Sequence, residues 1–418
     1  MKTMLNELLN AATIAHNMCD YQNAIIFYEK ALAIDSNLPQ VYIKIGNICL
    51  ELNALHDAIL YYQQAIELDK DNSYIAYSNI GIVFQKSNQI QEAKQYHEKA
   101  LEINPNYTIA LYNLSLIYLL DKNYIKGFDY YRFRYSKELR VGKKDVIAYL
   151  PTLLTKEIDI SEKTIYINHE QGIGDTIQTV RFLHIFAKKA KTILSYVPTS
   201  LNKLFAYNYP EIEFILPDNN IIFDYNFPMF EAPYLLGISY EKIQDNEKYL
   251  SVKKSDSKTF KSKYITNNNK IKICINYKGS ISSNSSIDLS ILINSLNKLD
   301  RKIFELYSVQ YDRTDEENQL LEDNNIINLG QHINDFYDTA IILENMDIII
   351  SIDTSVLHLA GAMGKKSFAL LNFVPDWRWG LEDSSTNWYK HIELIRQSSL
   401  NDWDSVLEKL IAKLEFNS

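Results

Sequence analysis

The feature that most constrains the fold is an internal repeat within residues 1–135. Three alanines, Ala24, Ala58 and Ala93, recur at spacings of 34 and 35 residues. Glycines Gly46 and Gly81 keep the same period. An aromatic ring or histidine follows each of the three alanines by four residues, and a second alanine follows by seven: Tyr28, Tyr62 and His97, then Ala31, Ala65 and Ala100. A period of this length predicts stacked pairs of helices, because one unit is too small to bury its apolar face without a neighbour.

These units resemble tetratricopeptide repeats. Residues 57–69 and 92–105 are similar to the second helix of such a repeat, where small residues let two helices approach closely. A fourth unit keeps the spacing but has Arg134 at the later alanine position, as expected of a terminal repeat. We expect residues 1–135 to form an α-solenoid whose groove binds a peptide or partner protein. The alternative is a spacer or a dimer-forming surface.

Composition narrows the functional classes. The 418 residues carry a net charge of −9, which repels phosphate backbones, so nucleic acid is not an expected partner. Three scattered cysteines, Cys19, Cys49 and Cys274, form no C-x-x-C pair, which argues against a disulfide scaffold and a cysteine-built zinc site. The eight histidines show no paired ligand spacing. We therefore expect a reducing compartment and no metal.

The sequence also lacks a recognisable membrane signal. Residues 1–9 are polar and amphipathic, without the apolar core of a signal peptide. The longest apolar stretches, such as residues 367–371, fall well short of the about 18 residues that would span a bilayer. We expect a cytoplasmic protein without a transmembrane segment.

Beyond a charged link at residues 136–160, short strands alternate with helices. The first series has strands at 163–168, 192–197, 211–216 and 221–225 and a helix at about 175–189, and a polar stretch at 248–269 then resembles an interdomain linker. The second series has strands at 271–276, 303–309, 347–352 and 367–371 and helices at 289–299, 337–344, 355–363 and 403–414. We expect two Rossmann-like, doubly wound domains, at residues 161–265 and 270–418, after the α-solenoid.

The first candidate loop follows the strand that ends at Asn168. Gly172 and Gly174 lie between this strand and the next helix, where glycine lets the backbone approach a ligand and free N–H groups attract an anion. Asp175 stands at the start of the helix. Its structural role would be a helix-capping carboxylate, and its functional role would be a general base or an anchor for a sugar hydroxyl.

The second candidate loop follows the strand that ends at Ile352. Asp353, Thr354 and Ser355 lead into a helix whose free N–H groups can cradle a diphosphate without a metal. His358 lies one turn into this helix, where it can neutralise or hydrogen-bond a leaving phosphate. A structural role is the alternative for a lone histidine.

Together these segments resemble a known family. Residues 170–178 and 353–365, followed by 374–379, look like bacterial tetratricopeptide-repeat glycosyltransferases related to ADP-heptose heptosyltransferases. The resemblance implies a GT-B fold and metal-independent transfer of a hexose or heptose from a nucleotide-sugar. It implies a protein or surface-glycan acceptor presented by the repeats. No cofactor beyond the nucleotide-sugar substrate is implied.

The resemblance also implies roles for individual residues. Asp175 matches the general base, and the donor-binding segment is matched by Asp353, Thr354, Ser355 and His358. Gln310 matches a position that lines the nucleotide pocket. Lys278 lies where it can offset phosphate charge.

One departure from the family concerns a cation. Relatives commonly have a tryptophan where this chain has Tyr277, and an arginine in the stretch that matches residues 284–289, which holds none here. Either Lys278 substitutes, or the donor differs, or the activity is reduced. The alternative function is therefore a non-catalytic interaction protein with a degenerate or sensing nucleotide-sugar-binding domain.

Two other patterns favour structural roles. Trp377, Trp379 and Trp388 could stack on a ligand ring, but such a density of tryptophans is more typical of packing. Residues 402–404 superficially match a metal-binding D-x-D motif, yet they open a helix, so we expect Asp402 to cap it.

Overall fold

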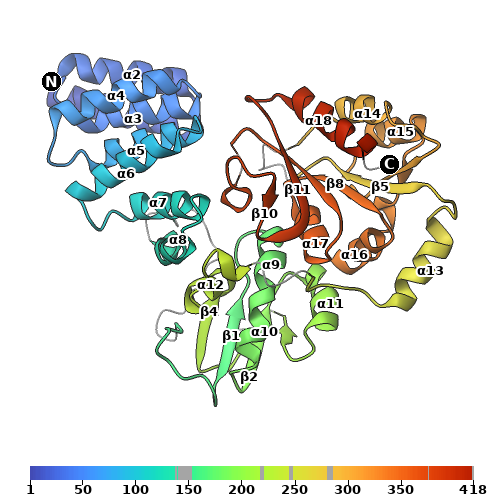
Figure 1. Ribbon diagram of the computed structural model, residues 1–418. Helices are drawn as coiled ribbons and strands as arrows, with labels where there is room; N and C mark the ends of the chain where they lie inside the picture. The colour runs from blue at the N-terminus through green and yellow to red at the C-terminus, as the bar shows by residue number, and fades with distance from the viewer. Residues whose placement is uncertain are drawn as a thin grey trace. The chain divides into compact units, whose positions relative to one another are not determined.

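The computed structural model describes residues 1–136, 139, 153–216, 221–243, 248–279, 286–374 and 376–416. The chain divides into two compact units (Figure 1). The first comprises residues 1–119 and 129–142, and the second comprises residues 120–128 and 143–418. Helical repeats are thus followed by a region of parallel and mixed sheets with helices. Among the described residues, no helix is both long and apolar enough to cross a membrane.

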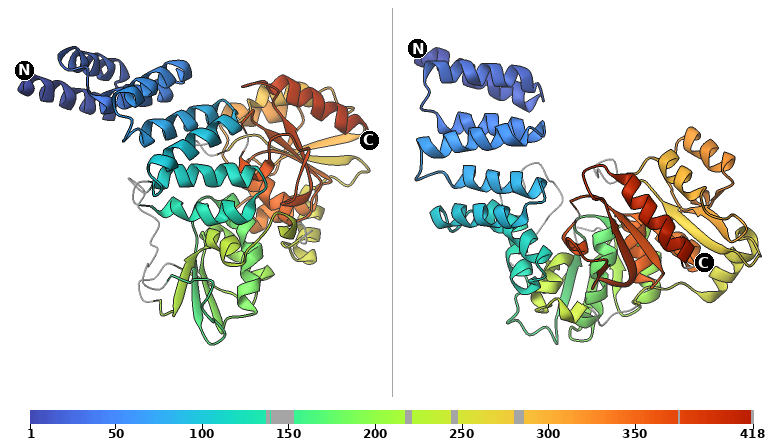
Figure 2. Two further views of the ribbon diagram at one scale, coloured as in Figure 1. Left: turned by 60° about the vertical axis from the view of Figure 1, so that its left-hand side comes forward. Right: turned by 45° about the horizontal axis from the view of Figure 1, so that its top comes forward.

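The repeats form helix pairs, with α1 against α2, α3 against α4 and α5 against α6 (Figure 2). The repeated alanines Ala24, Ala58 and Ala93 are fully buried in these contacts. Gly46 lets helix α3 approach helix α4 closely, because a Cβ at this position would lie 2.6 Å from the Tyr62 ring. The helices are α1 (Lys2–Asn17), α2 (Tyr21–Ile34), α3 (Pro39–Glu51), α4 (Leu55–Leu68), α5 (Tyr74–Lys86), α6 (Ile90–Ile103), α7 (Thr108–Leu120) and α8 (Tyr124–Tyr131).

The second unit contains a four-stranded parallel sheet in the order β3-β2-β1-β4. Its strands are β1 (Thr164–Asn168), β2 (Thr192–Tyr196), β3 (Glu213–Ile215) and β4 (Tyr225–Pro228). The accompanying helices are α9 (Ile173–Thr179), α10 (Leu183–Ala187), α11 (Thr199–Asn208) and α12 (Ala232–Leu235).

Two expectations for this sheet were wrong in detail. The strand expected at 221–225 begins only at Tyr225, where its backbone can pair with β1. The single helix expected at 175–189 is two short helices, α9 and α10, separated by a 3₁₀ turn at Val180–Phe182. An apolar pattern with a 3.6-residue period does not distinguish one long helix from two short helices joined by a 3₁₀ turn, because the turn shifts the periodicity only slightly.

The same unit contains a seven-stranded sheet in the order β10-β11-β9-β8-β5-β6-β7. Its strands pair in parallel, except that β10 and β11 are antiparallel. Branched apolar residues fill the central strands, and Ile273 and Ile350 are fully buried. The strands are β5 (Ile271–Asn276), β6 (Phe304–Ser308), β7 (Ile327–Asn328), β8 (Ile348–Ile352), β9 (Ser367–Leu371), β10 (Ser385–Thr386) and β11 (Tyr389–Arg396).

Helices complete this part of the unit. On α14 and α18, Leu296 and Leu410 join the same buried cluster as Ile273. The helices are α13 (Lys254–Tyr264), α14 (Leu289–Leu296), α15 (Asp315–Asp323), α16 (Phe336–Glu344), α17 (Ser355–Ala362) and α18 (Trp403–Phe416).

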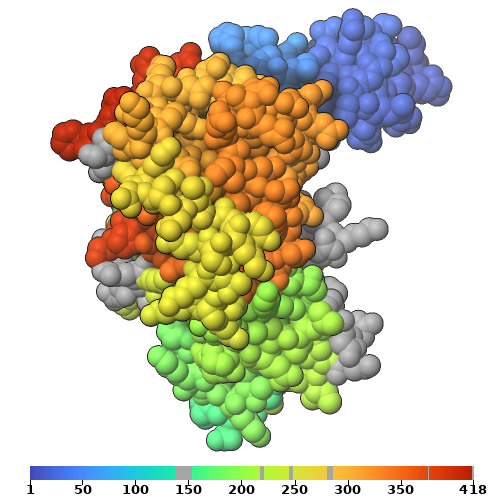
Figure 3. All heavy atoms as spheres, turned by 90° about the vertical axis from the view of Figure 1, so that its right-hand side faces the viewer, coloured from blue at the N-terminus to red at the C-terminus, as the bar shows by residue number. Residues whose placement is uncertain are grey.

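The polar stretch at 248–269, whose sequence resembles an interdomain linker, contains helix α13, which was not predicted. None of the residues of α13 is buried, and Figure 3 shows this yellow segment on the surface. Its sequence is rich in lysine and serine and carries no apolar stripe, which is why periodicity did not predict it.

Candidate functional site

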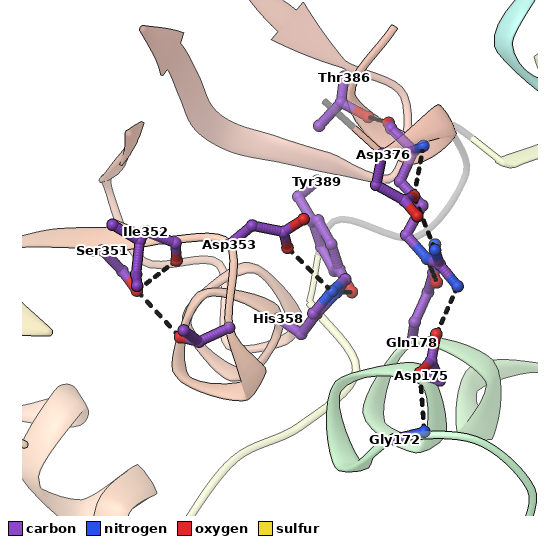
Figure 4. Close-up of polar contacts among 12 residues, drawn as sticks. Gly172, Asp175, Gln178, Ser351, Ile352, Asp353, His358, Asp376, Thr386 and Tyr389 are labelled. Atoms are coloured by element: carbon purple, nitrogen blue, oxygen red, sulfur yellow. Dashed lines mark hydrogen bonds and ion pairs between the residues drawn. The ribbon is translucent and has the colours of Figure 1, made fainter. Parts of the chain in front are cut away.

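The loops after β1 and β8 carry the candidate residues. Each strand lies between two parallel neighbours, β2 and β4 for β1, and β5 and β9 for β8. The loops therefore leave at the carboxyl edges of the two sheets, where α/β proteins bind ligands. Asp353 and Thr354 follow β8 directly, and Ser355 is the first residue of α17. Figure 4 shows Asp175 on one side and Asp353 and His358 on the other.

Asp175 is held from two directions. It is the third residue of α9, and the Gly172 backbone N–H donates to its Oδ2 at 2.8 Å. Its Oδ1 accepts a hydrogen bond from Arg378 Nη2 in an ion pair. Burial raises the pKa of Asp175 above its usual value, and the Arg378 guanidinium and the Gly172 N–H oppose this shift. The carboxylate thus caps its helix and also contacts a cation from the other sheet's loops.

Arg378 is the functional candidate that sequence reasoning missed. It lies in a 3₁₀ turn, Trp377–Trp379, which follows β9. Its side chain is only 7% exposed. Besides Asp175, it contacts Gln178 Oε1 through Nε at 2.5 Å and Asp376 Oδ1 through Nη1 at 2.7 Å. A signal existed in the sequence, namely an arginine between two tryptophans near a strand end, but nothing there linked it to Asp175.

Asp353, His358 and Tyr389 lie in a row. Asp353 Oδ1 is 3.8 Å from His358 Nε2, and His358 Nδ1 is 2.8 Å from the Tyr389 hydroxyl (Figure 4). Burial, together with Arg378 and Arg181, holds the pKa of His358 well below its usual value. The imidazole is therefore neutral at pH 7 and suited to hydrogen bonding rather than to neutralising a phosphate. Burial raises the pKa of Asp353 to about 7, and Asp376 adds to this shift.

The two candidate loops meet at Gly174. A Cβ built on this glycine would lie 2.6 Å from His358 Cδ2, so the backbone of α9 touches the imidazole of α17. The positive φ in this loop belongs instead to Gln171, at 64°. Gly174 is therefore needed for close approach to His358, not for a left-handed backbone.

The other expected donor-binding residues form a network at the same edge of the seven-stranded sheet. Thr354 Oγ1 donates to Asn276 Oδ1 at 2.7 Å, and Asn276 Nδ2 donates to Gln310 Oε1 at 2.7 Å. The Lys278 backbone N–H also donates to Gln310 Oε1, at 3.1 Å. Lys278 Nζ lies 3.6 Å from Glu317 Oε2. The structure thus connects Gln310 and Lys278 to the start of α17.

The tryptophans pack into the protein, which confirms the structural interpretation. Trp377, Trp379 and Trp388 are at most 6% exposed. The Trp388 indole N–H donates to the Tyr124 hydroxyl at 2.9 Å. The expected cap of the last helix is also confirmed, because Asp402 Oδ1 accepts from the Ser405 backbone N–H at 3.0 Å.

Of the expected departure from the family, residues 284 and 285 lie outside the described residues. Much of the expected link at 136–160 does so too. Within the part of the chain that the structure describes, no group of three or more histidine, cysteine or acidic side chains is arranged to hold a metal ion.

Comparison with family models matches the tetratricopeptide repeat at residues 8–38, 39–72 and 74–107. The N-terminal region is an array of tetratricopeptide repeats. Arrays of this kind typically bind protein partners in the groove formed by their stacked helices.

Solved structures match about a third of the chain. A crystal structure of MamA is 24% identical, with 33% of this chain and 75% of that chain covered and a TM-score of 0.29. PilF of Pseudomonas aeruginosa is 21% identical, with 34% and 62% covered and a TM-score of 0.30. The first repeat domain of RPAP3, bound to an HSP90 peptide, is 23% identical, with 28% and 92% covered and a TM-score of 0.26. Among curated proteins, no match was found.

Proposed function

We propose that the chain is a glycosyltransferase that moves a sugar from a nucleotide-sugar to a protein or surface-glycan acceptor. The observation that carries this proposal is the meeting of the two loops. Asp175, from the four-stranded sheet, lies beside the loops of the seven-stranded sheet, where His358 touches Gly174 and Arg378 binds Asp175. A GT-B arrangement of the two sheets is part of the proposal, since donor and acceptor would then meet between the carboxyl edges.

The chemistry assigns a role to each side. Asp175 takes the proton of an acceptor hydroxyl as its oxygen attacks the anomeric carbon. The bond from this carbon to the diphosphate oxygen breaks, and the nucleoside diphosphate leaves with the bonding electron pair. The free N–H groups at the start of α17 face the diphosphate, while Asp353 and the neutral His358 hydrogen-bond the donor. In this proposal the protein's own groups carry out the transfer, and no metal ion is needed.

The repeats supply the acceptor. Stacked helix pairs present a continuous surface along which a polypeptide can lie, and this separates acceptor choice from the chemistry of transfer. A protein acceptor fits this division of labour better than a small sugar, because a small sugar needs no extended surface.

The test is the substitution Asp175→Asn. Asparagine retains an oxygen that can accept from the Gly172 N–H, so the helix start survives, but it cannot take a proton. Transfer to candidate acceptors, followed by mass spectrometry, should fall by about 10²- to 10⁴-fold, with donor affinity retained. The matched control is Asp404→Asn, at the exposed start of α18. Full transfer by Asp175→Asn, with the control also active, would reduce Asp175 to a helix cap.

One observation favours the second candidate, a non-catalytic nucleotide-sugar sensor joined to an interaction module. Both carboxylate oxygens of Asp175 are already engaged, by Gly172 and Arg378. A base in such a state must exchange one of these contacts for an acceptor hydroxyl. Binding of a nucleotide-sugar without transfer to any acceptor, in the wild-type protein, would support the sensor.

A further inference from the structure

A buried arginine reaches from the loops of one sheet to the proposed base of the other. The Arg378 backbone follows β9 of the seven-stranded sheet, and its guanidinium contacts α9, which follows β1 of the four-stranded sheet. The rings of Trp377 and Phe230 flank the guanidinium carbon at 4.3 and 5.4 Å, and fix its plane. Arginine suits this place because its planar fork can serve several acceptors at once.

We infer that Arg378 is the positioning residue of the proposed transfer reaction, holding Asp175 ionised and oriented toward the acceptor. The inference rests on the proposed function. Asp175 alone would be a poor base, because a half-buried carboxylate favours its protonated form. A guanidinium in contact favours the charged form, and the Gln178 and Asp376 contacts prevent the arginine from turning away.

The proposed base depends on residues from both sheets. Asp175 is contributed by α9, but one of its two hydrogen bonds, and the cation that favours its ionised form, come from Arg378, which follows β9. Any movement that separates the two sheets would break this ion pair and remove one of the two hydrogen bonds that orient the carboxylate. The base is therefore ready only when the two sheets are in contact.

Several other titratable groups interact with Asp175. Asp376 and Glu170 raise its pKa, and Arg378 lowers it. Asp353 interacts with Asp175 across the site, and His169 interacts with it from the loop after β1. Asp376 binds Nη1 of Arg378 and Asp175 binds Nη2, so the two aspartates share the charge of one guanidinium.

Because Arg378 and Asp376 shift the pKa of Asp175 in opposite directions, their substitution should have opposite outcomes. Arg378→Gln removes the cation, so the acidic limb of the pH profile of transfer should move up by about 1–3 pH units. Asp376→Asn removes a negative charge that raises the pKa of Asp175, so the limb should move down, and the asparagine oxygen can still accept the hydrogen bonds from Arg378. The pH profile of transfer is measured for both variants at saturating donor.

The matched control is Arg301→Gln, whose guanidinium binds the backbone oxygens of Asn324 and Asn325 away from the site. It should leave the limb in place. The inference would be overturned if the acidic limb of the pH profile stayed in place in both Arg378→Gln and Asp376→Asn. It would also be overturned if the limb of Arg378→Gln moved to lower pH. Should Arg378→Gln fold poorly, the direction of the Asp376→Asn shift decides alone.

A second readout does not depend on activity. If Arg378 and Asp175 are coupled, the Tm losses of Arg378→Gln and Asp175→Asn should not add in the double variant. If the Tm losses of the variants are additive but the wild-type protein transfers sugar, the inference about Arg378 is wrong and the proposed function stands. If the losses are not additive but the wild-type protein transfers sugar to no acceptor, the proposed function is wrong and only the ion pair remains.

Discussion

Asp353 is a carboxyl group whose charge state changes near physiological pH. Burial raises its pKa to about 7, against about 3.9 in an unfolded chain. Between these two values the folded protein binds more protons than the unfolded one, so the stability contributed by protonated Asp353 is present below pH 4 and is lost as the pH rises through 7. At pH 8 the folded protein carries a buried charge that opposes folding.

The substitution Asp353→Asn should therefore stabilise the protein in a pH-dependent way. Asparagine resembles the protonated aspartic acid, so the Tm of the variant should match the wild type near pH 4. At pH 8 its Tm should exceed that of the wild type by several degrees, because the asparagine amide carries no charge that opposes burial. Thermal denaturation at both pH values checks this. A Tm difference that is the same at both would contradict the raised pKa of Asp353, and Asp404→Asn should show no such trend.

At the scale of elements, the contact between α9 and α17 joins the two sheets. It depends on Gly174, since a Cβ there would enter the ring of His358, which is 7% exposed and held by Tyr389. The imidazole cannot turn aside without breaking that hydrogen bond. The missing side chain of Gly174 is therefore part of the packing between the two sheets.

Gly174→Ala should separate these helices. Overpacking typically costs about 1–3 kcal/mol, which exceeds the gain of about 1 kcal/mol from replacing a helical glycine by alanine. We expect a lower Tm and, in the transfer assay, reduced activity. The double variant Gly174→Ala/His358→Ala provides the control, because removing the ring removes the clash. In that background Gly174→Ala should cost nothing, and an equal loss with and without the ring would contradict the contact.

The elements differ in how far the sequence could predict them. Strands β5 and β9 begin and end at the predicted residues, because buried parallel strands are short runs of apolar residues bounded by polar ones. Strand β11 was not predicted, since Lys390, His391 and Glu393 interrupt its apolar residues. Helix α15 was also missed, although Thr314 and Glu317 form a capping box at its start.

The candidate site shows the same limit. The loops with Asp175 and Asp353 were predicted, because a strand end followed by glycine or hydroxyl residues is a local pattern. The ion pair of Asp175 with Arg378 joins residues 203 positions apart. No period or spacing encodes such a pair, and only the crossing of the chain between two sheets brings it together.

At the scale of the whole molecule, the two units divide the tasks of the proposal. The repeats bury small residues between helix pairs, and the second unit has its own core between a seven-stranded sheet and its helices. Units with separate cores can unfold in separate transitions. A ligand that binds one unit should then raise only the transition of that unit, by mass action.

A nucleoside diphosphate should therefore stabilise the second unit alone, with EDTA present. At about 100 times its Kd a ligand contributes about 2.7 kcal/mol, or a rise in Tm of roughly 5–10 °C for a domain of this size. ADP, UDP and GDP are compared by calorimetry with their nucleosides, which lack the diphosphate that the start of α17 would bind. The repeat transition should stay in place. Stabilisation that requires Mg²⁺ or Mn²⁺ would contradict the metal-independent mechanism. Equal stabilisation by a nucleoside would show that the nucleoside part of the ligand, rather than the diphosphate at the start of α17, supplies the binding energy.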